Sequence, residues 1–174
     1  MRWPLGASEA RMRRTIVGVM GPGAGASQKD LEHGRRLGAL LAQQGWVVLC
    51  GGRSAGVMDA VCRGAKEAGG LTVGVLPGDD PGGASEAVDI AIVTGMGNAR
   101  NAINVLSSDL VVACGMGAGT ASEIALALKS DKDVIILGDH PEAIAFFRAV
   151  GKERVTVARD PDEVIAVARR LLGR

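Results

Sequence analysis

The sequence of 174 residues contains few aromatic side chains and no tyrosine. The aromatic residues are Trp3, Trp46, Phe146 and Phe147. Proteins that bind single-stranded nucleic acids stack bases on aromatic side chains, so this shortage argues against that class. It also implies that the hydrophobic core is built from aliphatic side chains, alanine and methionine rather than from aromatic rings.

Metal-ligating side chains are also scarce. His33 and His140 are the two histidines, and Cys50, Cys62 and Cys114 have no CxxC spacing. We therefore expect no metal site, and we interpret the cysteines as three buried thiols in a reducing compartment.

The sequence has neither a long apolar run nor a large net charge. No stretch approaches the roughly 18 apolar residues of a membrane helix, and the run at 15–20 is too short for the core of a signal peptide. The net charge is +1, and the basic excess lies within residues 1–14. We therefore expect a cytoplasmic protein that binds neither membranes nor nucleic acid. Residues 1–12 lack periodicity and are predicted to be a poorly ordered extension, and 13–174 a single domain.

Glycine, in contrast, is abundant. The chain has 26 glycines, which is about twice the usual share. They do not recur at every third position, which excludes a collagen-like helix. The apolar fraction of 47% and the charged fraction of 22% are typical of a globular domain.

Short β-branched runs alternate with helical stretches along the whole chain. We expect strands at 15–20, 46–50, 71–76, 90–93, 110–114, 134–137 and 155–158. We expect helices at 27–44, 57–68, 98–107, 120–129, 141–150 and 161–172. The strands lack apolar–polar alternation, which is typical of a parallel sheet covered on both faces. The pattern predicts an α/β fold, a Rossmann-like doubly wound sandwich with a parallel sheet of six to seven strands in the order 3-2-1-4-5-6.

The glycines cluster where predicted strands end and helices begin. The four clusters are Gly21/Gly23/Gly25, Gly51/Gly52/Gly56, Gly95/Gly97 and Gly115/Gly117/Gly119. Strand ends of a parallel sheet meet at one edge, where glycine leaves backbone N–H groups accessible and helix N-termini add positive charge. Glycines can also simply make tight turns, but four clusters at one edge favour a phosphate or oxyanion site.

Two common nucleotide sites are disfavoured. The pattern Gly21-x-Gly23-x-x-Ala26 fits a degenerate dinucleotide fingerprint, but the second strand ends in Cys50-Gly51-Gly52 without the acidic residue that binds the ribose. The GxxxxGK[ST] pattern of a P-loop is also missing from the sequence.

Two charged residues follow glycine clusters. Arg100 is predicted in the first turn of a helix, where a cation opposes the helix dipole unless it binds an anion. Glu123 could close a capping box with Thr120, or its carboxylate could act at the ligand. The residues alone leave both alternatives for Glu123 open.

Three ordered segments, 50–59, 95–101 and 115–123, resemble the GGGxxGLM, GMxxRK and PGGxGTxxE segments of the LOG superfamily. That superfamily contains the Lonely Guy cytokinin-activating phosphoribohydrolases and proteins long labelled lysine decarboxylases. This chain has Asn101 where the hydrolases have lysine, and Gly115-Met116-Gly117 where they have PGG. In these two segments the chain is more similar to the branch of the superfamily that includes molybdenum cofactor carrier proteins. The resemblance implies a Rossmann-like subunit that forms a homodimer or homotetramer.

The resemblance implies two main functions. The first is a carrier or store that holds the molybdenum cofactor as cargo and uses no catalytic cofactor. The alternative is a nucleoside 5′-monophosphate phosphoribohydrolase, in which Glu123 and Arg100 would be catalytic. A nucleotide sensor without turnover is a third possibility. Lysine decarboxylation is excluded, because it needs a pyridoxal-phosphate lysine and no lysine lies in a glycine loop.

The residues expected at the ligand come from all four clusters. They are Gly21, Gly23, Ser27, Gly51, Gly52, Gly56, Met58, Gly97, Asn98, Arg100, Asn101, Gly117, Ala118, Gly119, Thr120 and Glu123.

Overall fold

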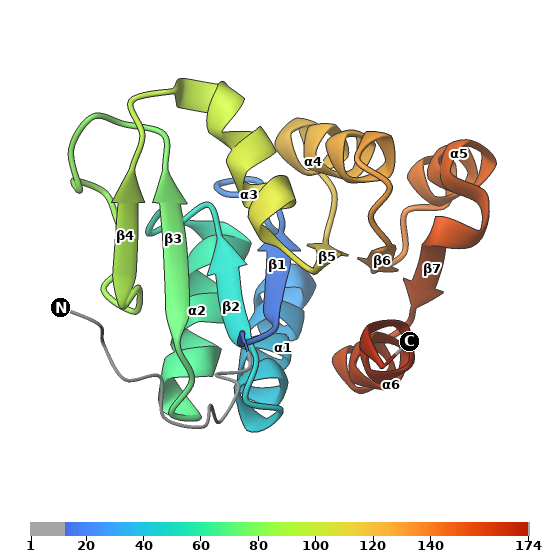
Figure 1. Cartoon of the computed structure of the whole chain (residues 1–174), viewed down its shortest axis with the longest axis horizontal. Coiled ribbons are helices and arrows are strands. Elements are labelled where there is room, and N and C mark those ends of the chain that lie inside the picture. The colour runs from blue at the N-terminus through green and yellow to red at the C-terminus, as the bar shows by residue number, and fades with distance from the viewer. Residues whose placement is uncertain (1–12, 174) are drawn as a thin grey trace, which may run out of the picture.

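The computed structural model describes residues 13–173, and the expected N-terminal extension lies outside the described residues. The described chain forms a seven-stranded parallel sheet between two layers of helices (Figure 1). The strands are β1 Ile16–Met20, β2 Val47–Cys50, β3 Thr72–Leu76, β4 Ile90–Val93, β5 Leu110–Cys114, β6 Val134–Leu137 and β7 Val155–Ala158. The helices are α1 Gln28–Gln43, α2 Gly56–Glu67, α3 Asn101–Ser107, α4 Ala118–Lys129, α5 Pro141–Gly151 and α6 Pro161–Leu172. The Rossmann-like α/β class is confirmed.

The strand order is β4-β3-β2-β1-β5-β6-β7, and every pairing is parallel. The predicted 3-2-1 half is correct, but the prediction that the fourth strand lies beside the first is wrong. Strand β4 lies at the edge next to β3, and β5 takes the place beside β1. The segment between β3 and β4 contains no helix, and a crossover that skips strands normally needs one. The connection to β5 contains α3, which crosses the sheet and places the switch point between β1 and β5.

The core has two layers, one on each face of the sheet. Helices α1, α2 and α6 pack on one face around side chains such as Leu37 and Val57. Helices α3, α4 and α5 pack on the other face around Ile124 and Phe147. Phe147 is 5% exposed, so the core is not entirely free of aromatic rings.

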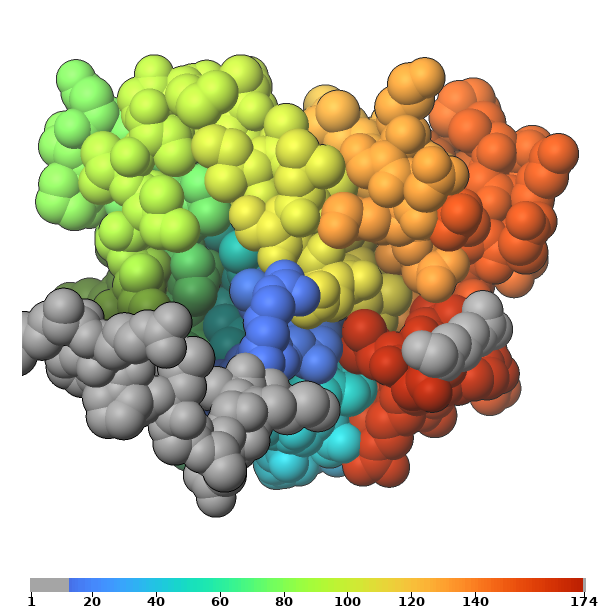
Figure 2. All heavy atoms as spheres, in the orientation of Figure 1, coloured from blue at the N-terminus to red at the C-terminus, as the bar shows by residue number. Residues whose placement is uncertain are grey.

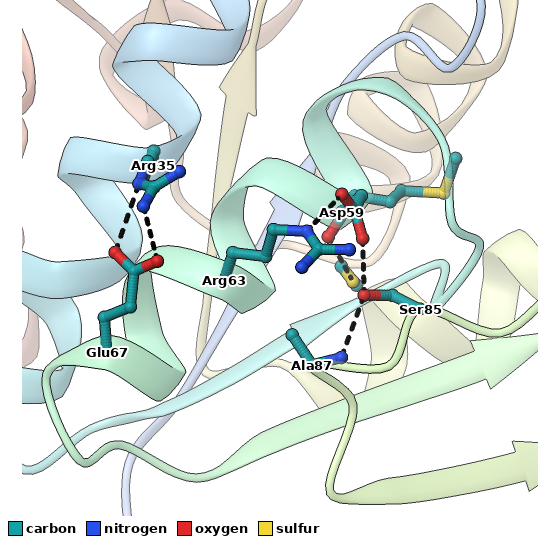
Figure 3. A network of polar contacts seen from close by, with 8 residues as sticks. Arg35, Asp59, Arg63, Glu67, Ser85 and Ala87 are labelled. Atoms are coloured by element: carbon teal, nitrogen blue, oxygen red, sulfur yellow. Dashed lines mark hydrogen bonds and ion pairs between the residues drawn. The ribbon is translucent and has the colours of Figure 1, made fainter.

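Some glycines bring α1 and α2 close together. A Cβ atom on Gly38 would overlap the carbonyl oxygen of Val61, and one on Gly64 would overlap that of Arg35. Part of the glycine excess therefore serves helix packing rather than a ligand. The ion pair between Arg35 and Glu67 bridges the same two helices (Figure 3).

Strand β4 is not covered on both faces, contrary to the expectation for all strands. Ile90, Ile92 and Val93 are between 41% and 47% exposed. Strand β4, the segment that follows it, α3 and α4 share one face of the molecule (Figure 2). None of the helices in residues 13–173 combines the length and apolar character that a bilayer span requires.

Candidate functional site

A pocket of about 260 Å³ opens at the carboxyl ends of β1 and β2, beside the N-terminus of α4. Its lining residues are Val19, Met20, Gly21, Gly23, Ala24, Gly51, Arg53, Met58, Asn98, Arg100, Asn101, Gly119, Thr120 and Glu123. The pocket therefore lies at the sheet edge to which the glycine clusters pointed, next to the switch point between β1 and β5.

Arg100 and Glu123 form a buried ion pair in this pocket. Arg100 Nη1 lies 3.6 Å from Glu123 Oε1, and the two residues are 8% and 6% exposed. Asn104 Nδ2 donates a hydrogen bond of 2.8 Å to the same carboxylate oxygen. Arg100 ends a 3₁₀ turn, Gly97–Arg100, that leads into α3. Because α3 packs against α4, residues from two helices meet at one carboxylate.

Burial changes the proton affinity of both partners. It raises the pKa of Glu123, although the Asn104 hydrogen bond and the charge of Arg100 act in the opposite direction. It lowers the pKa of the Arg100 guanidinium, although Glu123 counteracts this effect. An arginine remains charged even so, so the pocket keeps a buried cation beside a carboxyl group that protonates more readily than usual.

The capping-box alternative for Glu123 is wrong. Helix α4 begins at Ala118 with Gly117 as its N-cap and has no side-chain cap. Thr120 is therefore inside the first turn, so Glu123 is too far along the helix to reach the N-cap amide. Its carboxylate pairs with Arg100 and Asn104 instead.

Two polar atoms in the pocket wall lack partners within the protein. Arg100 Nε and Thr120 Oγ1 are buried and make no hydrogen bond to any residue of the described range 13–173. The first N–H groups of α4 have no partner inside the helix either, because they precede its first complete turn. Donors from a guanidinium, a hydroxyl and a helix N-terminus are the groups that bind phosphate and other oxyanions.

Two glycines of the pocket wall differ in the space around them. A Cβ atom on Gly51 would lie 2.6 Å from Arg100 Nη2 and 2.7 Å from Met58 Sδ. A Cβ atom on Gly119, in contrast, would have no neighbour within 4 Å among the described residues. Gly51 thus permits close packing of the wall, whereas Gly119 leaves space inside the pocket.

Several predicted ligand residues lie outside the pocket lining. Gly52, Gly56 and Gly97 have φ angles of +72°, +56° and +54°. Residues with a side chain rarely adopt this backbone conformation, so these glycines are explained by the turns they form. Ser27 caps α1 by accepting from the amide of Asp30. Gly117 and Ala118 begin α4.

The sequence reasoning missed Arg53 and Asn104. Arg53 is a second cation inside a glycine cluster, which is the same signal that identified Arg100. Its loop is held by a bridge between Arg53 and Ala84. Ser85 Oγ donates a hydrogen bond of 2.6 Å to Asp59 Oδ1, which ties the loop after β3 to α2 (Figure 3). Arg63, on the same helix as Asp59, donates to the other oxygen of this carboxylate.

Comparisons with known proteins identify the family of this chain. The profile of the SLOG cluster4 family matches residues 14–165. The solved molybdenum cofactor binding protein of the phototrophic bacterium Rippkaea orientalis is 51% identical with a TM-score of 0.91, covering 92% of this chain and 99% of that one. The molybdenum cofactor carrier protein of Chlamydomonas reinhardtii is 50% identical with a TM-score of 0.89, covering 93% of this chain and 100% of that one.

A curated relative extends the similarity to an archaeon. An uncharacterized protein of Archaeoglobus fulgidus is 43% identical over 126 residues, which are 72% of this chain and 82% of that protein. The resemblance inferred from the three glycine segments is confirmed. The chain belongs to the SLOG cluster4 family.

Proposed function

We propose that the protein binds the molybdenum cofactor as cargo, with the phosphate or an oxyanion of the ligand held in the pocket at the N-terminus of α4. The observation that carries this proposal is the convergence of Arg100 Nε and Thr120 Oγ1, both buried and without partners in the described chain, on one pocket. Two solved proteins with 51% and 50% sequence identity to this chain support the choice of ligand, because they are named for binding or carrying this cofactor.

The charge of the pocket fits an anion. Among the described residues, two arginines, Arg53 and Arg100, line it with one carboxyl group, that of Glu123, whose pKa is raised by burial. Met20 and Met58 offer adaptable apolar surface to the rest of a ligand.

The test is a titration of the protein with the molybdenum cofactor and with molybdate alone. Arg100→Ala should weaken binding by about 10- to 150-fold, the loss that corresponds to a hydrogen bond with a charged group. Arg35→Ala is the matched control, because it removes an arginine whose side chain is 58% exposed on α1 and outside the pocket. Absence of saturable binding to the unsubstituted protein would contradict the proposal.

A second candidate function is hydrolysis of nucleoside 5′-monophosphates. It is favoured by Glu123, whose carboxyl group faces the pocket beside Arg100 and can stabilise an oxocarbenium-like ribose or orient water. Incubation with AMP and isopentenyl-type nucleotides tests it. Release of free base that Glu123→Ala abolishes would support hydrolysis and contradict a pure carrier.

We further propose that the chain self-associates through the face formed by β4, α3 and α4. Ile92, Met96 and Leu106 are large apolar side chains exposed on this face by 41%, 49% and 62%. A hollow between α3 and α4 continues the face and shares Asn98 and Asn101 with the ligand pocket. Exposed apolar surface of this kind is typical of a protein interface.

A further inference from the structure

Two of the three cysteines lie side by side behind the pocket. Cys50 Sγ and Cys62 Sγ are 3.4 Å apart, and both residues are fully buried. Cys50 ends β2, and Cys62 lies in α2, the helix that also carries the pocket residue Met58. Cys114 lies apart from this pair, and its Sγ contacts the carbonyl oxygen of Asp30 at 3.6 Å.

Cys50 is the more acidic thiol of the pair. The hydrogen bond with Cys62 lowers the pKa of Cys50 although burial raises it, and the Gly52 amide, which donates to Cys50 Sγ at 3.3 Å, and the charge of Arg100 also lower it. Donation to Cys50 raises the pKa of the Cys62 thiol. The pair therefore has one sulfur with a lowered pKa and a second sulfur, 3.4 Å away, that can resolve a product formed on the first.

The pair is connected directly to the candidate ligand site. Cys50 is followed by Gly51, whose Cα is packed against the Arg100 guanidinium and Met58. Gly51 therefore links Cys50 to the Arg100 guanidinium by direct packing.

We propose that Cys50 and Cys62 form a reversible disulfide under peroxide, and that this disulfide weakens anion binding in the adjacent pocket. The Cys50 sulfur attacks one oxygen of hydrogen peroxide, the O–O bond breaks, and Cys50 sulfenic acid and water result. The Cys62 sulfur then attacks the Cys50 sulfur, the S–O bond breaks, and the Cys62 proton leaves with the hydroxyl group as a second water. Two thiols are oxidised and one peroxide is reduced to two waters.

The expected effect on the pocket follows from the contraction of the pair. The two sulfurs move from 3.4 Å to about 2.05 Å in a disulfide. Gly51 follows Cys50 directly and packs against the Arg100 guanidinium and Met58, and the Gly52 amide donates a hydrogen bond to Cys50 Sγ. We expect this segment to absorb the shift and to displace the Arg100 guanidinium from its place in the pocket. The consequence for cargo rests on the proposed function, but disulfide formation does not.

The experiment treats the full-length protein with hydrogen peroxide and maps its thiols by mass spectrometry. The expected product is a Cys50–Cys62 disulfide that dithiothreitol reverses. Cys114→Ala should still form it, and Cys62→Ala should not. Oxidation should also shift the NMR resonances of the Gly51 and Gly52 amides and of Arg100 Nε, and should reduce molybdate affinity by about 5- to 150-fold, the range typical of coupled sites.

Other results would contradict the disulfide, its link to the pocket or the proposed function. Three unreacted thiols, or oxidation of Cys114 in preference to the pair, would overturn the proposal. A disulfide that leaves the Arg100 resonance and the molybdate affinity unchanged would overturn its link to the pocket. A reduced protein that binds no anion, but whose Arg100 resonance shifts on oxidation, would contradict the proposed function and support the redox link.

Discussion

Arg100 Nη1 and Glu123 Oε1 lie 3.6 Å apart, and both side chains are buried in the wall of one pocket. Burying a carboxylate and a guanidinium has a large desolvation cost, which a single long ion pair does not fully offset. Buried charged groups with shifted pKa values are therefore characteristic of sites that bind a ligand or carry out a reaction.

Glu123→Gln should increase the affinity for sulfate at least about tenfold at alkaline pH, because it removes a negative charge close to the anion. In the unsubstituted protein the affinity should increase as pH falls through the raised pKa of Glu123, because the protonated carboxyl group no longer repels the anion. Calorimetric titration across pH checks this, since sulfate keeps its charge in this range. An equal pH dependence in the variant would show that another group is responsible.

The same carboxyl group should affect folding stability. The native state binds the Glu123 proton more tightly than the unfolded chain, because its pKa is raised above the ordinary value of 4.5. The free energy of unfolding should therefore decrease as pH rises from the ordinary to the raised pKa, and Glu123→Gln should remove this decrease. Urea unfolding of both proteins across this pH interval measures the difference.

Gly119→Ala should stabilise the fold and weaken ligand binding. The new Cβ has no neighbour within 4 Å among the described residues and extends into the pocket. Replacing a helical glycine with alanine adds up to about 1 kcal/mol of stability. Thermal unfolding and molybdate titration measure the two effects separately.

Gly38→Ala is the matched control for this glycine. Its Cβ would overlap the Val61 carbonyl oxygen between α1 and α2, so it should destabilise the fold, by about 1–3 kcal/mol, the usual cost of overpacking. Loss of stability in both variants would mean that Gly119 also serves packing.

Thr120→Val should weaken oxyanion binding by about 2- to 12-fold, the contribution of one neutral hydrogen bond. The fold should not lose stability, because the Thr120 hydroxyl has no hydrogen-bond partner among residues 13–173 and valine has nearly the same shape. Molybdate titration with a parallel unfolding measurement checks both expectations. A variant of normal affinity would remove Thr120 from the site.

Leu106→Asp should shift the protein toward monomers, because it places a charge in the proposed interface. Sedimentation velocity measures the change, and circular dichroism verifies that the fold is retained. Phe146→Asp is a suitable control, since Phe146 is also 62% exposed but lies on α5, outside the proposed face. An unsubstituted protein that sediments as a monomer would contradict the proposed self-association.

The sequence by itself determined the elements and the edge of the sheet at which the pocket lies. The β-branched runs and the helical stretches between them are local signals, so the strands and helices they predict agree with the structure to within a few residues. Glycine clusters after strands pointed to the edge with the pocket, because the carboxyl ends of parallel strands lie at one edge of the sheet.

Tertiary structure alone decided the strand order and the partners of the buried groups. Nothing local distinguishes an edge strand such as β4 from a central one, so its place beside β3 comes from the packing of the whole sheet. Glu123 pairs with Arg100 rather than capping its own helix, because α3 packs on α4. Cys50 lies beside Cys62 because α2 packs on β2. Each contact joins residues that are distant in sequence, and their distance in space depends on how whole elements pack rather than on any pattern within one of them.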